Sequence, residues 1–234
     1  MNSNKIIVAL DFSDEKSALR FCDQISPDAC NVKVGKELFL VAGPKIVEKL
    51  AIRGFSVFLD LKFHDIPATV EKACKNAVDM GVWMMNVHAS GGRDMLLAAR
   101  SAVPKGRGEP LLLGVTVLTS LNQRDLQEIG FVENLPVIVN KLTGLAHDSG
   151  LDGVVCSADE ASGIQTKYGD GFLRVTPGIR TENQSHDEQK RVKTPIEGIK
   201  NGSSFLVMGR PVTRSSRPMA VLEEINAAIK PWIF

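Results

Sequence analysis

Two carboxylates and an amine lie close together in "FLDLKFHDIP" (residues 58–67), which begins in an apolar run. Asp60 and Lys62 are two positions apart, and Asp65 follows three positions later. Residues i and i+2 of a strand point to the same face, so the acid and the base should lie side by side. A charge that leaves water has to be paired and hydrogen-bonded. The spacing therefore predicts a partly buried Asp–Lys pair on one strand.

Two earlier apolar runs supply the same kinds of charge. Asp11 ends the run "VALDF", and Lys33 lies within "NVKVG". If these runs are neighbouring parallel strands, Asp11, Lys33, Asp60 and Lys62 form an alternating chain of acids and bases at one edge. A structural ion-pair network is the alternative interpretation of the same pattern.

The alternating charges limit the chemistry. Carboxylates close to Lys62 favour its ammonium form, which is a poor Schiff-base nucleophile and a good proton donor. Lys33 and Lys62 together disfavour a divalent cation, because such a site needs carboxylates without ammonium neighbours. We therefore expect general acid catalysis without a metal ion.

Two later runs end in glycine and arginine. The run "VTPGIR" contains Gly178 and Arg180, and "VMGRPVT" contains Gly209, Arg210 and Pro211. Glycine lets the backbone approach a ligand, arginine binds phosphate through two donors, and proline suits the first turn of a helix, whose N-terminus attracts anions. These runs predict a phosphate site.

The charged residues need a scaffold that brings the strand ends together. Eight apolar runs lack polar alternation, as is typical of parallel strands covered on both faces. They are Ile6–Phe12, Asn31–Gly35, Ser56–Lys62, Met84–Ala89, Leu111–Thr119, Gly153–Ala158, Leu173–Gly178 and Ser204–Arg210. Amphipathic segments between and after them predict helices over Asp14–Ile25 (capped by Ser13), Glu37–Ile52, Thr69–Met80 and Pro218–Ile229. This alternation predicts a single-domain (β/α)8 TIM barrel over residues 1–234, with the site at the carboxyl ends of the strands; a doubly wound sheet is the alternative.

Composition excludes several classes of protein. The chain has 44% hydrophobic and 24% charged residues and a formal net charge of +1, so nothing indicates a nucleic-acid partner. The four cysteines lack CxxC spacing and are expected to be reduced structural thiols. We find neither a signal peptide nor a run of membrane-spanning length, and we expect a cytoplasmic protein.

Two further features allow more than one interpretation. The segment Thr181–Arg191, "TENQSHDEQKR", contains no apolar residue and is either a solvated loop or a mobile lid. His88 ends the fourth run, and we interpret it as a neutral, hydrogen-bonded side chain rather than a catalytic one.

The sequence resembles the orotidine 5'-phosphate decarboxylase family. "DLKFHDIPATV" resembles its DxKxxD signature, and further motifs fall in family order along nearly the whole chain. These are "VALD", "KVGKELF", "NVHASGG", "VTVLTS", "GVVCSA", "VTPGIR" and "GRPVT".

The resemblance implies an activity and a role for each site residue. The enzyme would decarboxylate orotidine 5'-monophosphate to uridine 5'-monophosphate in pyrimidine synthesis, without metal or cofactor. Lys62 would protonate C6 of the pyrimidine, Asp60 would lie beside the substrate carboxylate, and Asp65 would enter the second site of a homodimer. The implied substrate-binding residues are Asp11, Lys33, Thr69, Thr119, Ser120, Arg180, Gln189, Gly209 and Arg210.

Two other functions compete with this one. A magnesium-dependent sugar-phosphate aldolase or decarboxylase could use the same barrel, but by resemblance it would have a carboxylate at the position of Lys33. A non-catalytic protein that binds a phosphate ligand would need the arginines and not the Asp–Lys chain.

Overall fold

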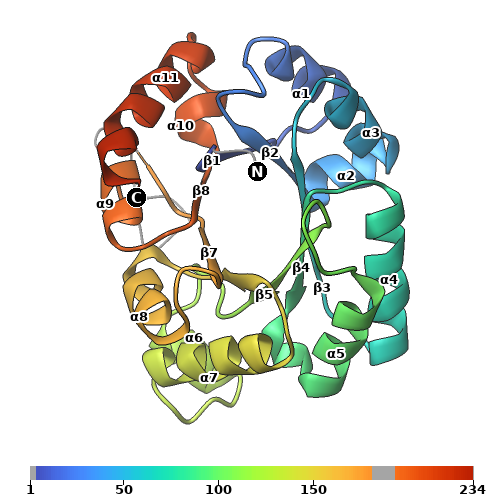
Figure 1. Cartoon of the computed structure of the whole chain (residues 1–234), viewed down its shortest axis with the longest axis vertical. Helices are drawn as coiled ribbons and strands as arrows, with labels where there is room; N and C mark the ends of the chain where they lie inside the picture. Colours follow the sequence, from blue (N-terminus) through green and yellow to red (C-terminus); the bar gives the residue numbers. More distant parts are fainter. Residues whose placement is uncertain (1–3, 181–192, 234) are drawn as a thin grey trace.

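Eight parallel strands close into a barrel in the computed structural model, which describes residues 4–180 and 193–233. The strands follow one another around the barrel in chain order (Figure 1), and β1 closes the ring on β8 with Ile7 opposite Val207. Their bounds are β1 Ile6–Ala9, β2 Asn31–Gly35, β3 Val57–Phe63, β4 Met84–His88, β5 Leu111–Val115, β6 Gly153–Val155, β7 Leu173–Thr176 and β8 Phe205–Met208. The predicted barrel is confirmed. The doubly wound alternative is wrong, because β1 and β8 pair with each other.

Helices surround the barrel (Figure 1), and they connect each strand to the next. The α-helices are α1 Glu15–Cys22, α2 Lys36–Ala42, α3 Lys45–Ile52, α4 Pro67–Asp79, α5 Arg93–Ala102, α6 Gln123–Glu128, α7 Leu135–Asp148, α8 Ala158–Tyr168, α9 Pro195–Lys200, α10 Arg210–Thr213 and α11 Pro218–Ile229. Two 3-10 turns, η1 Ala89–Gly91 and η2 Lys230–Trp232, complete the described elements. None of the described helices is long and apolar enough to cross a membrane.

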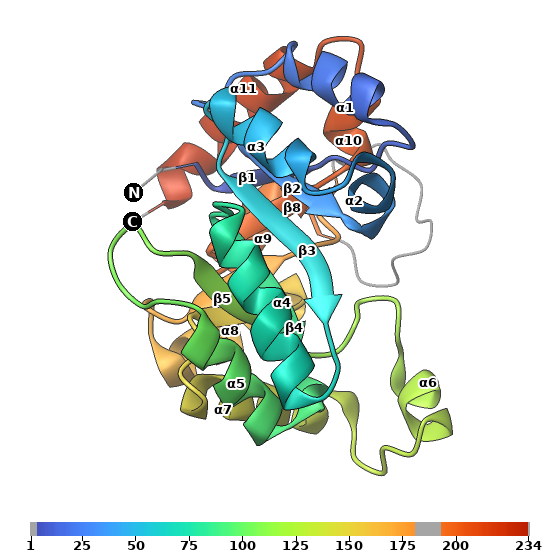
Figure 2. The same cartoon turned by 90° about the vertical axis from the view of Figure 1, so that its right-hand side faces the viewer.

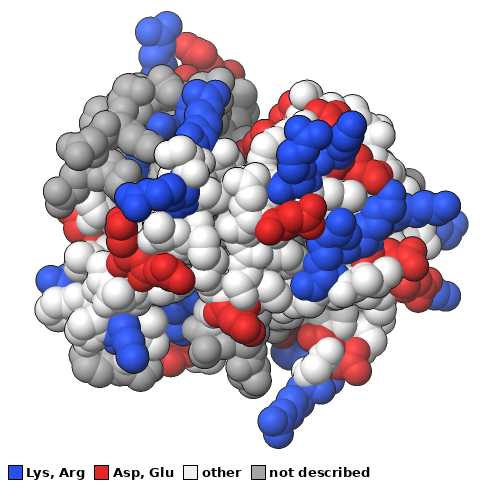
Figure 3. All heavy atoms as spheres, turned by 90° about the horizontal axis from the view of Figure 1, so that it is seen from above, with Lys and Arg blue, Asp and Glu red and all other residues white. Residues whose placement is uncertain are grey.

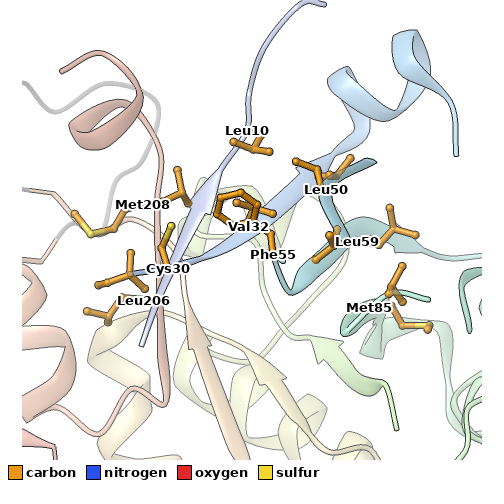
Figure 4. Packing of buried hydrophobic residues seen from close by; sticks show 14 of the residues in the cluster. Leu10, Cys30, Val32, Leu50, Phe55, Leu59, Met85, Leu206 and Met208 are labelled. Carbon is orange, nitrogen blue, oxygen red and sulfur yellow. The ribbon is translucent and has the colours of Figure 1, made fainter. Parts of the chain in front are cut away.

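Apolar side chains fill two layers because the strands are covered on both faces. The outer layer lies between strands and helices, where Figure 4 shows Val32, Leu59 and Leu206. The inner layer fills the barrel and includes Phe58 and Met84. This double burial explains why the strands read as continuous apolar runs.

Two expectations about helices are wrong. Ser13 does not cap the first helix; Asp14 does, and its Oδ1 accepts a hydrogen bond from the backbone N of Ser17 at 2.8 Å. The single helix predicted over Glu37–Ile52 is two helices, α2 and α3. Gly43, with a φ of 66°, ends α2, and Pro44 cannot donate the backbone hydrogen bond that would continue it.

Most strands end earlier in the sequence than predicted. β1 ends at Ala9 rather than Phe12, and β5 ends at Val115 rather than Thr119. Leu10 and Val117 stay buried beyond these ends, so an apolar pattern continues where strand pairing has stopped. Asp11 therefore lies in the loop after β1.

The long connection between β5 and α7 carries α6 away from the barrel, on the side toward which the arrowhead of β3 points (Figure 2). A small apolar cluster, which includes Val117, Leu126 and Ile138, packs within this connection and against α7. On the face shown in Figure 3, basic and acidic side chains are interspersed, in keeping with the net charge of +1.

The four cysteines are buried free thiols, as predicted from their spacing. Burial raises the pKa of Cys22, Cys30 and Cys74 to about 12. These thiols are therefore protonated and packed in the core.

Candidate active site

The four charges predicted to form a chain do so at the carboxyl ends of β1, β2 and β3. The Nζ atom of Lys33 lies 3.4 Å from Oδ1 of Asp11 and 3.2 Å from Oδ2 of Asp60. The other carboxylate oxygen of Asp60, Oδ1, lies 2.6 Å from Nζ of Lys62. Asp60 thus binds one ammonium with each oxygen, and the order along the network is Asp11, Lys33, Asp60, Lys62.

Burial divides this network into a fixed middle and two accessible ends. The side chains of Lys33 and Asp60 are 10% and 12% exposed, whereas those of Lys62 and Asp11 are 25% and 61% exposed. A ligand above the strand ends can therefore reach Lys62, while the buried pair holds it in place.

The middle of the network is charged in the folded protein. Burial alone would raise the pKa of Asp60, but Lys33 and Lys62, with hydrogen bonds from Lys62 and Asn86, lower it to about 2. Burial would lower the pKa of Lys33, yet Asp60 and Asp11 outweigh it and raise that pKa above its ordinary value. Each buried charge is thus stabilised by its neighbours.

A fifth residue, Asn86 on β4, belongs to this network and was not predicted. It is fully buried, and its Nδ2 donates to Oδ1 of Asp60 at 2.7 Å. Its Oδ1 accepts from the backbone N of Lys62 at 2.8 Å. The available signal was one amide within the apolar run "MMNVH", a polar residue where a covered strand has no solvent to face.

Lys62 has an unusual backbone. Its φ of 52° is the only positive value at a non-glycine residue among residues 4–180 and 193–233. A left-handed conformation costs a residue with a Cβ on the order of 1–2 kcal/mol. The surrounding contacts must offset that cost, as is common at functional sites.

Two glycines leave room for the network. A Cβ atom on Gly35 would lie 3.2 Å from Nζ of Lys33, and one on Gly209 would lie 3.6 Å from Oδ2 of Asp11. Gly209 follows β8, so the end of β8 reaches the acidic end of the network. The predicted phosphate side and the charged side therefore meet at Asp11.

The two arginines predicted to bind phosphate follow β7 and β8. Arg180 is buried, and its backbone N donates to the carbonyl of Lys193 at 2.9 Å. Gly178, two positions before it, has a φ of 82°, which explains glycine there. Arg210 is half-buried and begins α10, rather than ending β8 as predicted. Gln189, together with the proposed lid over Thr181–Arg191, lies outside the described residues.

The remaining predicted site residues lie on loops and a helix start. Thr119 is half-buried and Ser120 exposed after β5, and Thr69 is exposed in the first turn of α4. Asp65 is exposed between β3 and α4, where its Oδ1 accepts from the backbone N of Ile66 at 2.7 Å. Ile66 holds the N-cap position of α4, so Asp65 does not cap that helix.

His88 lies at the edge of the network as a neutral imidazole. Its ring packs on that of His64, with the ring centroids 5.3 Å apart. Burial, followed by the nearby His64 and Lys62, lowers the pKa of His88 to about 4. A group with that pKa is neutral at pH 7, as expected from the sequence, but the expected hydrogen bond of its ring is not seen among the described residues.

Comparison with known proteins gives one consistent family. The family model "Orotidine 5'-phosphate decarboxylase / HUMPS family" matches residues 4–225. The chain is 53% identical to the orotidine 5'-phosphate decarboxylase of Hydrogenovibrio crunogenus over 225 residues, which are 96% of this chain and 95% of that one. It is 53% identical to the enzyme of that name from Nitrosomonas eutropha, with 98% of each chain covered. A crystal structure of orotidine 5'-phosphate decarboxylase from Lactobacillus acidophilus superimposes with a TM-score of 0.86 at 37% identity, covering 97% of this chain and 99% of that one.

Proposed function

The chain belongs to the orotidine 5'-phosphate decarboxylase / HUMPS family, and from that membership we propose that it decarboxylates orotidine 5'-monophosphate to uridine 5'-monophosphate. The observation that carries this proposal is the Asp11–Lys33–Asp60–Lys62 network, whose accessible ammonium is that of Lys62. The family membership names the substrate, and the network supplies the chemistry.

The proposed step needs one proton and no electron acceptor. The bond between C6 of the pyrimidine and its carboxylate breaks, carbon dioxide leaves, and the electron pair stays on C6. The ammonium of Lys62 then donates its proton to C6, and water protonates the resulting amine. The 25% exposure of the Lys62 side chain supports this return of the proton from solvent.

The network favours this step through electrostatics. Negative charge develops at C6 next to an ammonium that is already held by Asp60 at 2.6 Å, so little reorganisation is needed. Asp60 would lie beside the substrate carboxylate, where its negative charge favours the departure of that group. Lys33 would keep Asp60 ionised, and its ammonium beside that carboxylate disfavours a divalent cation there.

We assign the rest of the substrate to other residues around the barrel mouth. Arg180, Gly209 and Arg210, with Gln189, would hold the phosphate, and Asp11 would hold the ribose. Thr119, Ser120 and Thr69 would contact the pyrimidine and its surroundings. This assignment is supported by where the described residues of this set lie. They follow β5, β7 and β8 or lie at the start of α4, at the end of the barrel that carries Lys62.

We propose that the protein is a homodimer with shared sites. Asp65 is exposed, and its neighbour Ile66 is a large apolar residue with 66% of its surface accessible. On α2, which follows the neighbouring strand β2, Leu40 is 82% exposed. An exposed apolar residue next to Asp65 in the chain and another on α2 fit a surface that a second copy covers, with Asp65 entering that copy's site.

A cytoplasmic location of the protein stays a prediction.

A direct assay tests the proposed function. Purified protein is mixed with orotidine 5'-monophosphate, and the loss of substrate absorbance and the release of carbon dioxide are followed with EDTA and with added magnesium. We expect equal turnover in both conditions. Turnover that EDTA abolishes and magnesium restores would favour the magnesium-dependent alternative, and binding of the nucleotide without turnover would favour the non-catalytic one.

A further inference from the structure

The pairing of β3 with β4 is interrupted where the catalytic lysine lies. Leu59 pairs with Met85, and the next pair is Phe63 with Val87. β3 therefore uses four steps where β4 uses two, so two residues of β3 are extra in this interval. A bulge of this kind leaves backbone groups without their ladder partners and turns side chains in a new direction.

Asn86 replaces the missing partner. It is the residue of β4 between Met85 and Val87, opposite the bulge, and its Oδ1 accepts the backbone N–H of Lys62 at 2.8 Å. The same amide donates through Nδ2 to Oδ1 of Asp60 at 2.7 Å. A backbone N–H can only donate and an ionised carboxylate can only accept, so the amide has one orientation that satisfies both.

The amide thus connects the backbone of Lys62 to the carboxylate that holds its side chain. Oδ1 of Asp60 accepts from Asn86 and also from Nζ of Lys62 at 2.6 Å. The φ of 52° at Lys62 is costly without a fixed partner for that backbone. Asn86 is completely buried, so no water at its surface can take over the two hydrogen bonds.

We propose that Asn86 is a positioning residue, whose amide holds the β3 bulge and so places the ammonium of Lys62 against Asp60. The kinetic test of this proposal rests on the proposed function. Hydrogen exchange at the backbone N–H of Lys62 gives a second test, which does not depend on any reaction.

The test compares two variants that differ in the space they fill. Asn86→Ala removes both hydrogen bonds and most of the side chain, and Asn86→Leu removes both bonds but keeps a similar volume. The matched control is Asn31→Ala on β2, since Asn31 is also fully buried and donates to the carbonyls of Asn4 and Ile6. Asn31 begins its strand, at the barrel end opposite the site.

Misplacing a reacting group by about 1 Å costs about 100-fold in rate, so both Asn86 variants should lose about that factor in kcat. KM should change by less than about threefold, because the amide holds the lysine and not the substrate. Hydrogen exchange should show the Lys62 amide exchanging at least about tenfold faster, with the Leu59 amide as the reference. Asn31→Ala should lose stability and keep both kcat and the Lys62 protection.

Several results would overturn the proposal. The first is a folded Asn86 variant whose kcat is within about threefold of the wild-type value. The second is full activity in Asn86→Leu alone. The third is a fall in the kcat of Asn31→Ala equal to that of the Asn86 variants. Unchanged protection of the Lys62 amide from hydrogen exchange in the Asn86 variants would also overturn the proposal. If neither Asn86 variant folds, the amide serves folding rather than the site and the proposal fails. A wild-type protein without decarboxylase activity would refute the proposed function, and hydrogen exchange would still decide the role of Asn86.

Discussion

Replacing Asp60 with asparagine should remove a defined part of the protein's resistance to acid. The neighbouring ammonium groups lower the pKa of Asp60 from its ordinary value of 3.8 to about 2, although burial opposes them. At about 1.4 kcal/mol for each pH unit, this difference corresponds to about 2–3 kcal/mol in the free energy of unfolding. The side chain is 12% exposed, so solvent screens little of that contribution.

The sign follows from the direction of the change. Because the pKa is lower in the folded protein, the contribution is complete above the unfolded value of 3.8 and is lost as the pH falls through about 2. Asparagine has the same shape and does not titrate. The difference in unfolding free energy between wild type and Asp60→Asn should therefore be constant above about pH 5 and shrink by about 2 kcal/mol toward pH 2, where Asp60 is half protonated in the folded protein.

Urea denaturation at a series of pH values measures this difference. Asp11→Asn is the control, since Asp11 is 61% exposed and its ion pair with Lys33 should contribute less than about 1 kcal/mol. A wild-type to Asp60→Asn difference that varies by less than about 0.5 kcal/mol between pH 5 and pH 2 would refute the charged state that we assign to the network.

Four more predictions concern the site. Lys62→Ala should lose at least the roughly 100- to 10,000-fold that a general acid contributes while keeping its circular dichroism spectrum; a tenth of wild-type turnover would contradict its role. Arg210→Ala should reduce decarboxylation of the nucleotide far more than that of the phosphate-free nucleoside, and equal losses would show that Arg210 does not act through phosphate. Mixing Lys62→Ala with Asp65→Ala protein should restore activity to about a quarter of the sites after subunit exchange, whereas no gain after verified exchange would exclude a shared site. The His88 imidazole should titrate by NMR with a pKa of about 4, and a value near 6.5 would show that His64, Lys62 and burial do not act on it as described.

The sequence was sufficient to predict the barrel and the charged chain, because both depend on local pattern. Continuous apolar runs predicted covered parallel strands, and a charge at the end of such a run needs a partner. Asp11, Lys33, Asp60 and Lys62 met as expected once neighbouring strands were paired in chain order.

The part that could not be predicted depends on register between strands. We expected Asp60 and Lys62 to share a face through simple alternation, but β3 bulges between Leu59 and Phe63. The role of Asn86 follows only from the bulge opposite it. Gly43 and Pro44 mark the break between α2 and α3 in the sequence, and their effect on the backbone outweighs the apolar periodicity around them.

The buried thiols offer a way to observe how the barrel opens. A thiol-specific alkylating reagent reacts with the thiolate, and a pKa of about 12 leaves almost none of it at neutral pH for Cys22, Cys30 and Cys74. Each thiol becomes reactive only when its surroundings separate. Cys22 ends α1, Cys30 precedes β2, Cys74 lies in α4 and Cys156 follows β6. Peptide mapping after timed labelling of the native protein would therefore report opening rates for separate sectors of the barrel without any introduced probe.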